Sequence, residues 1–242
     1  MAAADVARLS RRSGFVFAGE VERTNASTVE LVRPTKEIAV VRVRQVLKAP
    51  ADFGDRKGKR VTVRLASPAR KGQTAVFFTI GWVSGEGLAV QEVGRQPASD
   101  VGTMRKQMDE AHDRDEVSAL RKRVGEADTV VAGKVASTRP LGVAELAFAS
   151  EHDPQWWTAV VVVEQAEKGR AKEGERLEIA YASSRDVMWF DAPKPVEGQR
   201  AVFLAHLRRL EMRDETALAI VAPIDLLPVE EMERVRRVMG RK

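Results

Sequence analysis

Two halves of the chain repeat one another, and this constrains the fold more than any other feature of the sequence. Residues 15–21 read FVFAGEV and residues 129–135 read TVVAGKV, which places Gly19 opposite Gly133. Further blocks match in the same order, namely AVVRVRQVLK (39–48) with AVVVVEQAEK (159–168), GKRVTVR (58–64) with GERLEIA (174–180), KGQTAVFF (71–78) with EGQRAVFL (197–204), and LAV (88–90) with LAI (218–220). Only the intervening segments differ in length, as expected for one strand framework with variable loops. The chain is therefore expected to contain two copies of one structural unit.

Each block has the alternation of a β-strand. Apolar Val61, Val63 and Leu65 alternate with polar residues, a period of two that is typical of a half-buried strand. A further short strand is expected at residues 29–31 in the first half and at residues 144–148 in the second. About six short strands per half, separated by turns, favour a small antiparallel barrel or sandwich.

Gly19 and Gly133 lie inside two of these apolar runs. A glycine inside a strand indicates a β-bulge or a sharp bend, because it permits a close approach of the backbone. A long first strand that bends in this way allows a small barrel to close. We therefore expect each half to form a barrel.

Helices are expected to flank the barrels. Residues 5–12 (DVARLSRR) and 116–124 (EVSALRKRV) align just ahead of the first strand of each half. Residues 100–114 carry an apolar stripe that is out of register with the stripe of 116–124, so two helices or one kinked helix are predicted there. The last helix is expected to begin at Pro228 and to end at Gly240, since proline favours helix starts and glycine favours helix ends.

These patterns predict a mainly β fold with flanking α-helices: two tandem small antiparallel β-barrels (OB-like), related by the repeat. The expected domains are a helix plus the first barrel over residues 1–98, a helical linker over 99–125, the second barrel over 126–228 and a C-terminal helix over 229–242. The length of 242 residues accommodates two such units.

The succession G-[EK]-V, V-x-V-x-x-[VA]-x-K, G-[KE]-R-[VL]-x-[VI] and G-Q-x-A-V-F-[FL] resembles a tandem barrel repeat of bacterial proteins, which is similar to the netrin-like or TIMP-like version of the OB-fold. The resemblance covers most of residues 13–93 and 127–222, and its motifs are structural rather than catalytic. It implies two Greek-key barrels of five or six strands with flanking helices. Secreted metalloprotease inhibitors of this type carry stabilising cysteines, which this chain lacks, so the resemblance extends to the fold and not to the inhibitory activity.

The composition argues against an enzyme. The chain has no Cys, and its three His (His112, His152 and His206) are far apart in sequence, with no apparent partner for His206. The run Glu151-His152-Asp153 has metal-capable side chains, but consecutive residues seldom converge on one ion. Ser183-Ser184 lacks the glycines of a hydrolase elbow, and the phosphate-binding glycine motifs are absent. We therefore expect no catalytic residues, no metal and no cofactor.

The basic charge balance raises nucleic acid as an alternative partner. Lys+Arg number 40 against Asp+Glu 35, which gives a net charge of +5 and a pI of about 9.6. Single-strand binding uses a basic groove with aromatic stacking platforms. The basic turns that would form this groove are Lys57, Lys59, Arg60, Lys168, Arg170 and Lys172. Acidic residues adjoin these turns and aromatic residues make up only 5% of the chain, so a solvated surface of mixed charge is favoured over a single-stranded nucleic-acid site.

The second half also carries large apolar residues in segments whose first-half counterparts lack them. These residues are Trp156, Trp157, Met188, Trp189 and Phe190. Neighbouring residues of a strand point to opposite faces, so at most one of the two adjacent tryptophans enters the barrel. The cluster either packs within the protein, as a plug or between barrels, or it forms a recognition surface. The functional hypothesis is a protein-binding or scaffold module that recognises a protein partner, or assembles with itself, through these residues.

No stretch approaches the roughly 18 apolar residues of a membrane helix. Arg8, Arg11 and Arg12 are not followed by the apolar region of a signal peptide. A cytoplasmic protein without a membrane span is therefore expected, or a secreted or envelope protein if the sequence is a mature form whose signal peptide was removed.

Overall fold

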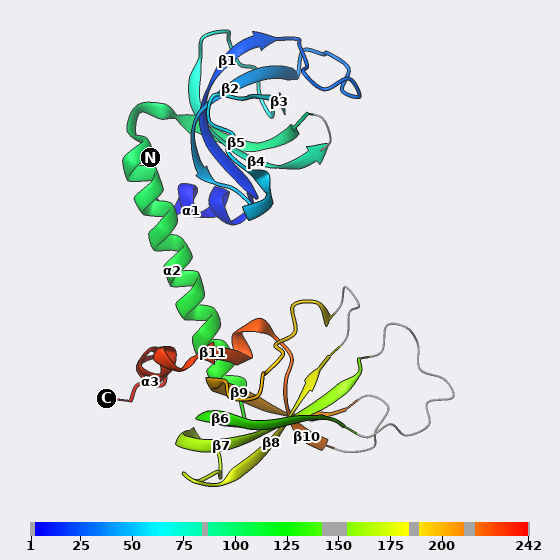
Figure 1. The fold of residues 1–242 in the computed structure, drawn as a ribbon. Coiled ribbons are helices and arrows are strands. Elements are labelled where there is room, and N and C mark those ends of the chain that lie inside the picture. Colours follow the sequence, from blue (N-terminus) through cyan, green and yellow to red (C-terminus); the bar gives the residue numbers. More distant parts are fainter. Residues whose placement is uncertain (1–2, 84–86, 142–153, 184–188, 211–215, 242) are drawn as a thin grey trace. The chain divides into compact units, whose positions relative to one another are not determined.

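The computed structural model describes residues 3–83, 87–141, 154–183, 189–210 and 216–241 (Figure 1). The chain divides into two compact units, Met1–Arg114 and Asp115–Lys242. Each unit contains one small barrel, so the predicted fold class, mainly β with flanking helices, is confirmed.

The first unit closes into a five-stranded barrel. Its elements are α1 (Ala3–Arg11), β1 (Phe15–Thr24), β2 (Ile38–Lys48), η1 (Ala51–Phe53), β3 (Arg60–Arg64), β4 (Thr74–Val83), β5 (Ala89–Pro97), η2 (Ala98–Asp100) and the first part of α2 (Val101–Glu126). The strand order is β1-β2-β3-β5-β4, and β4 pairs back to β1. The pairs are antiparallel except for β3 with β5, which is parallel. This arrangement is an OB-like Greek-key barrel.

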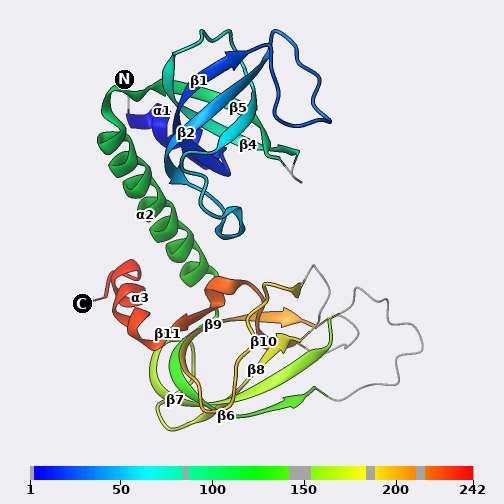
Figure 2. The same ribbon diagram turned by 45° about the horizontal axis from the view of Figure 1, so that its top comes forward.

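The second unit repeats this strand order and carries one further short strand, β11 (Leu226–Pro228); Figure 2 labels its strands. After α2 its elements are β6 (Thr129–Pro140), β7 (Trp156–Lys168), β8 (Arg176–Ala182), β9 (Arg200–Arg209), β10 (Thr216–Ile220), η4 (Pro223–Asp225), β11 (Leu226–Pro228), η5 (Val229–Glu231) and α3 (Met232–Val238). The order around the barrel is β6-β7-β8-β10-β9, β9 pairs back to β6, and β8 with β10 is the parallel pair. The duplication seen in the sequence is thus a duplication of the fold.

The repeat extends beyond the matched sequence blocks. Pro97 at the end of β5 pairs with Ala75, and Pro228 at the end of β11 pairs with Ala201. Ala75 and Ala201 are matched residues of the repeat. The single strand β5 therefore corresponds to β10 and β11 together, with η4 interrupting the strand in the second unit.

Both first strands contain bulges at equivalent places, as the glycines predict. The register of β1 against β2 shifts at Ala18/Gly19, and that of β6 against β7 shifts at Ala132/Gly133. A Cβ atom added at Gly133 would lie 2.5 Å from the carbonyl oxygen of Val162, closer than any side chain tolerates. Glycine is needed at these bulges because the neighbouring strand approaches so closely.

Residues 29–31, expected to form a strand, form turns instead. The Ser27 hydroxyl donates to the carbonyl oxygen of Val29 (2.8 Å) and accepts from its amide (2.9 Å). Such local side-chain bonds compete with a sheet ladder. Val29 and Val32 are buried in a small cluster, so the apolar alternation here marks a loop that covers the barrel rather than a sixth strand. The corresponding expectation at 144–148 lies outside the described residues.

A helix packs on the outer face of each barrel ahead of its first strand. Leu9 of α1 shares a buried cluster with Val16, and Leu120 of α2 shares one with Val130, the residue that matches Val16 in the repeat. A lysine at the end of the second strand secures each helix. Lys48 Nζ donates to Ser10 O (3.0 Å), and Lys168 Nζ donates to the carbonyl oxygens of Val124 (3.1 Å) and Gly125 (2.8 Å).

Helix α2 explains the two stripes that are out of register. Its first half buries Met104 and Met108 in the cluster of the first barrel, and its second half buries Leu120 and Val124 in the cluster of the second. Each stripe therefore faces a different barrel, and one continuous helix over Val101–Glu126 replaces the two helices or kinked helix considered from the sequence.

Helix α3 repeats the first half of α2. Met232 and Val235 of α3 pack in the cluster that contains Leu120. The helix begins at Met232, later than predicted, because the preceding residues form β11 and η5. Gly240 ends it with a positive φ of 73°, and the amide of Arg241 donates to the carbonyl of Arg236 (3.0 Å), the bond of a Schellman cap.

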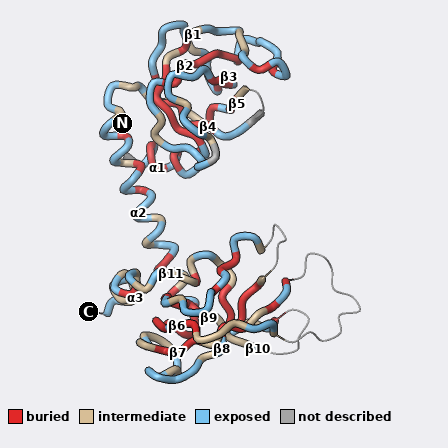
Figure 3. The backbone as a smooth tube through the Cα atoms, viewed as in Figure 1, coloured by how far each residue is buried: buried red, intermediate tan, exposed pale blue. Residues whose placement is uncertain are grey.

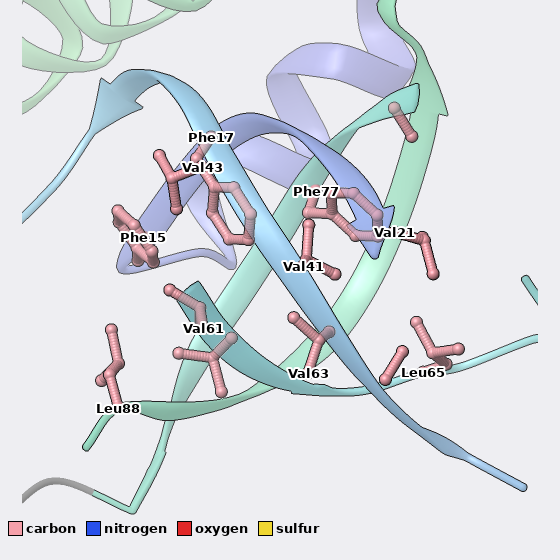
Figure 4. Packing of buried hydrophobic residues seen from close by; sticks show 13 residues of the cluster. Phe15, Phe17, Val21, Val41, Val43, Val61, Val63, Leu65, Phe77 and Leu88 are labelled. Carbon is pink, nitrogen blue, oxygen red and sulfur yellow. The ribbon is translucent and has the colours of Figure 1, made fainter. Parts of the chain in front are cut away.

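The barrel interiors are buried and apolar (Figure 3). In the first barrel the rings of Phe15, Phe17 and Phe77 stack in series, with centroids 4.7 Å and 5.4 Å apart (Figure 4). In the second barrel Val131 replaces Phe17, and only Phe203 keeps an aromatic ring at the matched positions. The two interiors are therefore filled differently on the same framework.

Candidate functional site

Trp156 and Trp157 at the start of β7 contribute to different clusters, as the alternation of a strand requires. Trp157 packs against the barrel interior beside Tyr181, with ring centroids 6.4 Å apart. Trp156 is buried in a separate cluster, and its ring meets that of Trp189 edge-on at 5.9 Å. Trp157 therefore packs against the core of the barrel, and Trp156 packs against the segment that connects β8 to β9.

That segment forms a turn closed by a lysine. Lys194 Nζ donates to the carbonyl oxygen of Phe190 (3.0 Å) and to those of Trp189 and Ala192 (3.4 Å each). The amide of Ala192 donates to the carbonyl of Trp189 at 3.1 Å, and Ala192 is buried in the cluster of Trp156. The backbone from Trp189 to Lys194 is thus fixed both by packing and by hydrogen bonds.

Phe190 is the exposed aromatic residue of this turn, with 72% of its surface accessible. Trp189 is half-buried and Trp156 is buried, so the structure separates the predicted aromatic residues into packing residues and one displayed ring. Met188 lies outside the described residues. Scattered exposed hydrophobic residues are common on soluble proteins, but Phe190 is an exposed ring on a turn whose backbone is held in place.

The basic residues of the nucleic-acid alternative divide between the two units. Arg60 Nε lies 2.6 Å from Glu22 Oε2, and hydrogen bonds from Arg60 and Arg42 lower the pKa of Glu22. Lys168 caps the carbonyl end of α2. Lys168 is partly buried, and the other five residues of the set are exposed, namely Lys57, Lys59, Arg60, Arg170 and Lys172. The side chains of Arg60 and Lys168 therefore make polar contacts within the protein.

A buried ion pair was not predicted from the sequence. Asp225 in η4 is fully buried and accepts hydrogen bonds from Arg123 Nε (2.5 Å) and Nη2 (2.7 Å), and from the amides of Val221 (2.8 Å) and Ala222 (2.9 Å). Burial acts to raise the pKa of Asp225, but these hydrogen bonds outweigh it and hold the pKa below its ordinary value. His206 Nε2 lies 3.4 Å from Asp225 Oδ1 but makes no hydrogen bond to any described residue. The cluster ties α2 to the strands of the second barrel.

The first barrel has a buried carboxylate, Glu92, whose pKa is shifted in the opposite direction. Glu92 accepts a hydrogen bond from the amide of Ala66 (3.1 Å), and Arg95 Nε lies 3.7 Å away. Burial raises the pKa of Glu92, and Arg95 and the Ala66 amide offset this only in part. Arg95 Nη2 also donates to the carbonyl of Ser67 (2.7 Å), so this pair holds the turn that matches the aromatic segment of the second unit.

Among the described residues, no three His, Asp or Glu side chains are grouped so that they could hold a metal ion. No helix in the described part of the chain has the length and apolar character needed to cross a membrane. No protein-family model matches this chain, and no curated protein matches it.

Proposed function

We propose that the protein is a non-enzymatic binding module whose second barrel captures a protein partner through Phe190. The observation that supports this role is the exposed ring of Phe190 on the turn closed by Lys194 and anchored by Trp189 against Trp156. Aromatic side chains are enriched among the residues that contribute most to protein–protein affinity.

The fixed turn is important for the energetics of capture. Burying one phenylalanine side chain contributes about 1.5–3 kcal/mol. Ordering a loop on binding would reduce that gain, and a turn that is already ordered avoids this cost. The hydrogen bonds from Lys194 therefore favour binding even though Lys194 need not touch the partner.

The comparison between the two units points to the same role. The turn at 66–70, the first-half counterpart, is held by Arg95 through Ser67 and carries no aromatic residue. The strand residues are thus duplicated, whereas the exposed ring of Phe190 has no counterpart in the turn of the first unit. A difference of this kind is expected where one copy has acquired an interaction and the other provides structure.

Affinity capture from the source cells, after nuclease treatment, tests the proposal. We expect Phe190→Ser to reduce the recovered partner at least tenfold, while Leu31→Ser has no effect. Leu31 is a suitable control because it is an exposed apolar residue of the first unit, 84% accessible. Equal recovery by both variants, with unchanged circular dichroism, would show that Phe190 does not carry the interaction.

A further inference from the structure

The first barrel closes one end of its interior with its own aromatic side chain. Phe53 of η1 packs on Phe15, with ring centroids 5.3 Å apart, and against the core cluster that contains Val61 and Leu88. Phe15, Val61 and Leu88 lie together at one end of this core (Figure 4). Arg56 completes the closure, because its Nε donates to the carbonyl of Phe53 (2.7 Å) and its guanidinium lies 5.7 Å from the ring centroid.

The described part of the second barrel lacks this closure. The matched residue for Phe15 is Thr129, and the segment between β7 and β8 spans residues 169–175, against 49–59 between β2 and β3. The shorter segment reads GRAKEGE and contains no aromatic residue. Leu177 and Leu218 match Val61 and Leu88, but they are partly exposed, whereas Val61 and Leu88 are buried.

A hollow of about 570 Å³ lies at this end of the second barrel. Its apolar lining is Ala171, Leu177, Leu207 and Leu218, and its polar lining includes Asp128, Thr129, Arg170 and Glu175. No described side chain of the second unit takes the place that Phe53 has in the first. A lining of apolar side chains with a few polar groups is the general character of a binding pocket.

We propose that this hollow binds one aromatic side chain of a partner polypeptide, inserted as Phe53 is inserted in the first barrel. The occupant is inferred from the chain itself, where the equivalent space holds a phenylalanine on a short turn with an arginine three residues later. The site does not depend on Phe190, which is not among its lining residues.

The charges of the rim fit the same occupant. Asp128 Oδ2 accepts from the amide of Leu207 (2.6 Å), and Glu175 Oε2 accepts from the amide of Lys172 (2.9 Å), so both carboxylates are held in place. They outnumber the single rim cation, Arg170. A basic residue close to the inserted ring would therefore be favoured, as Arg56 follows Phe53 in the first barrel.

A synthetic peptide with the sequence of residues 48–59 (KAPADFGDRKGK) is the probe. Added to the full chain, it is expected to shift the methyl NMR signals of Leu177 and Leu218 in a saturable way. The same peptide with Phe53→Ala should bind at least tenfold more weakly. Absence of these shifts at millimolar peptide, or equal binding of the two peptides, would overturn the proposal. Saturation of the site by phenol at a lower concentration than the peptide would also overturn it, in favour of a small aromatic ligand.

Variants of the full chain locate the site. Thr129→Phe restores the residue of the first barrel and is expected to fill the hollow, with at least a tenfold loss of peptide binding. Leu207→Ser removes the apolar side chain without adding a carboxylate that would attract the basic peptide. It should give a similar loss without affecting the fold, since Leu207 is 59% exposed, and it tests the site if Thr129→Phe does not fold. Leu31→Ser and Phe190→Ser should bind the peptide as the unmodified chain does. Undiminished binding by Leu207→Ser, or loss of binding in either control, would contradict the site.

Discussion

Trp189 and Phe190 are neighbours in the sequence, but the structure gives them different environments. Trp189 packs edge-on against the buried ring of Trp156, whereas Phe190 is 72% exposed. Trp189 packs on the cluster that contains Trp156, and Lys194 holds the backbone carbonyls of both residues of the pair. A sequence of two adjacent aromatic residues carries no local signal for this choice.

Single alanine substitutions should separate these two roles. Trp189→Ala is expected to lower the free energy of unfolding by about 2 kcal/mol, because it removes a half-buried ring and leaves a gap beside Trp156. Phe190→Ala should change it by less than about 0.5 kcal/mol, as for an exposed side chain. Urea unfolding followed by circular dichroism measures both. A larger loss for Phe190→Ala would mean that its ring packs within the protein.

Asp225 gives a prediction for pH dependence. Its pKa in the folded protein is lowered, so its contribution to stability is complete above the ordinary carboxyl pKa and is lost as pH falls through the folded value. Asp225→Asn should therefore lower the free energy of unfolding by about 2–4 kcal/mol at pH 7, and this difference should shrink between about pH 5 and pH 3.

Urea unfolding followed by tryptophan fluorescence checks this dependence, since three of the four tryptophans, Trp156, Trp157 and Trp189, lie in the second unit. Glu178→Gln is the control, because Glu178 forms an exposed ion pair with Arg139 and should have little effect at any pH. A difference between Asp225→Asn and the unmodified chain that stays constant down to pH 3 would contradict the role given to the carboxylate.

Sequence patterns predict the residues whose environment is local and miss those whose partners are distant. The opposite placement of Trp156 and Trp157 follows from strand geometry alone. Asp225 and Arg123 are 102 positions apart, so no local pattern joins them. The aligned blocks place Thr129 against Phe15, so the sequence shows that the second barrel has a smaller residue there. That this smaller residue leaves a hollow follows only from the position of Phe53, which the structure gives.

At the scale of elements, the bulges in β1 and β6 control how the barrels close. Their glycines were identified from the sequence because a glycine within an apolar strand is unusual. The prediction of a strand at 29–31 was wrong, because alternation of apolar residues also occurs in a loop that covers a core. Ser27 stabilises the turn there.

Gly133→Ala should strongly destabilise the second barrel. The added Cβ would lie 2.5 Å from Val162 O and 2.6 Å from Val161 Cγ1, so β6 and β7 would have to separate. We expect a loss of about 3 kcal/mol or more, as for other severe backbone clashes. Gly125→Ala in α2 is the matched control, because nothing lies within 4 Å of its added Cβ and alanine favours helices. Thermal denaturation measures both, and equal melting temperatures for the two variants would argue against the bulge constraint.

At the scale of the whole molecule, the chain is a duplicated arrangement of helix, barrel and helix. The helix that precedes each barrel and the helix that follows it both pack on its outer face, and α2 is the second helix of one unit and the first helix of the next. The periodicity of the strands was sufficient to predict the two barrels. The continuity of α2 was not predictable, because its two apolar stripes face different barrels and the helix as a whole lacks one apolar face.

This organisation predicts that each unit folds on its own when it keeps α2. Fragments 1–126 and 101–242 each include a complete barrel and the helices that cover it. Both are expected to show β-rich circular dichroism and cooperative thermal unfolding. Loss of structure in either fragment would mean that its core is incomplete without the other unit.

We propose that the second unit carries the recognition surface and that Phe190 lies within it. Photo-crosslinking in the source cells tests this most directly, with a benzoylphenylalanine placed at position 190 or, as the control, at the exposed position 31 of the first unit. The predicted result is a discrete crosslinked protein from position 190 and none from position 31. The same crosslinked product from both positions, or a product from position 31 alone, would contradict this role of Phe190.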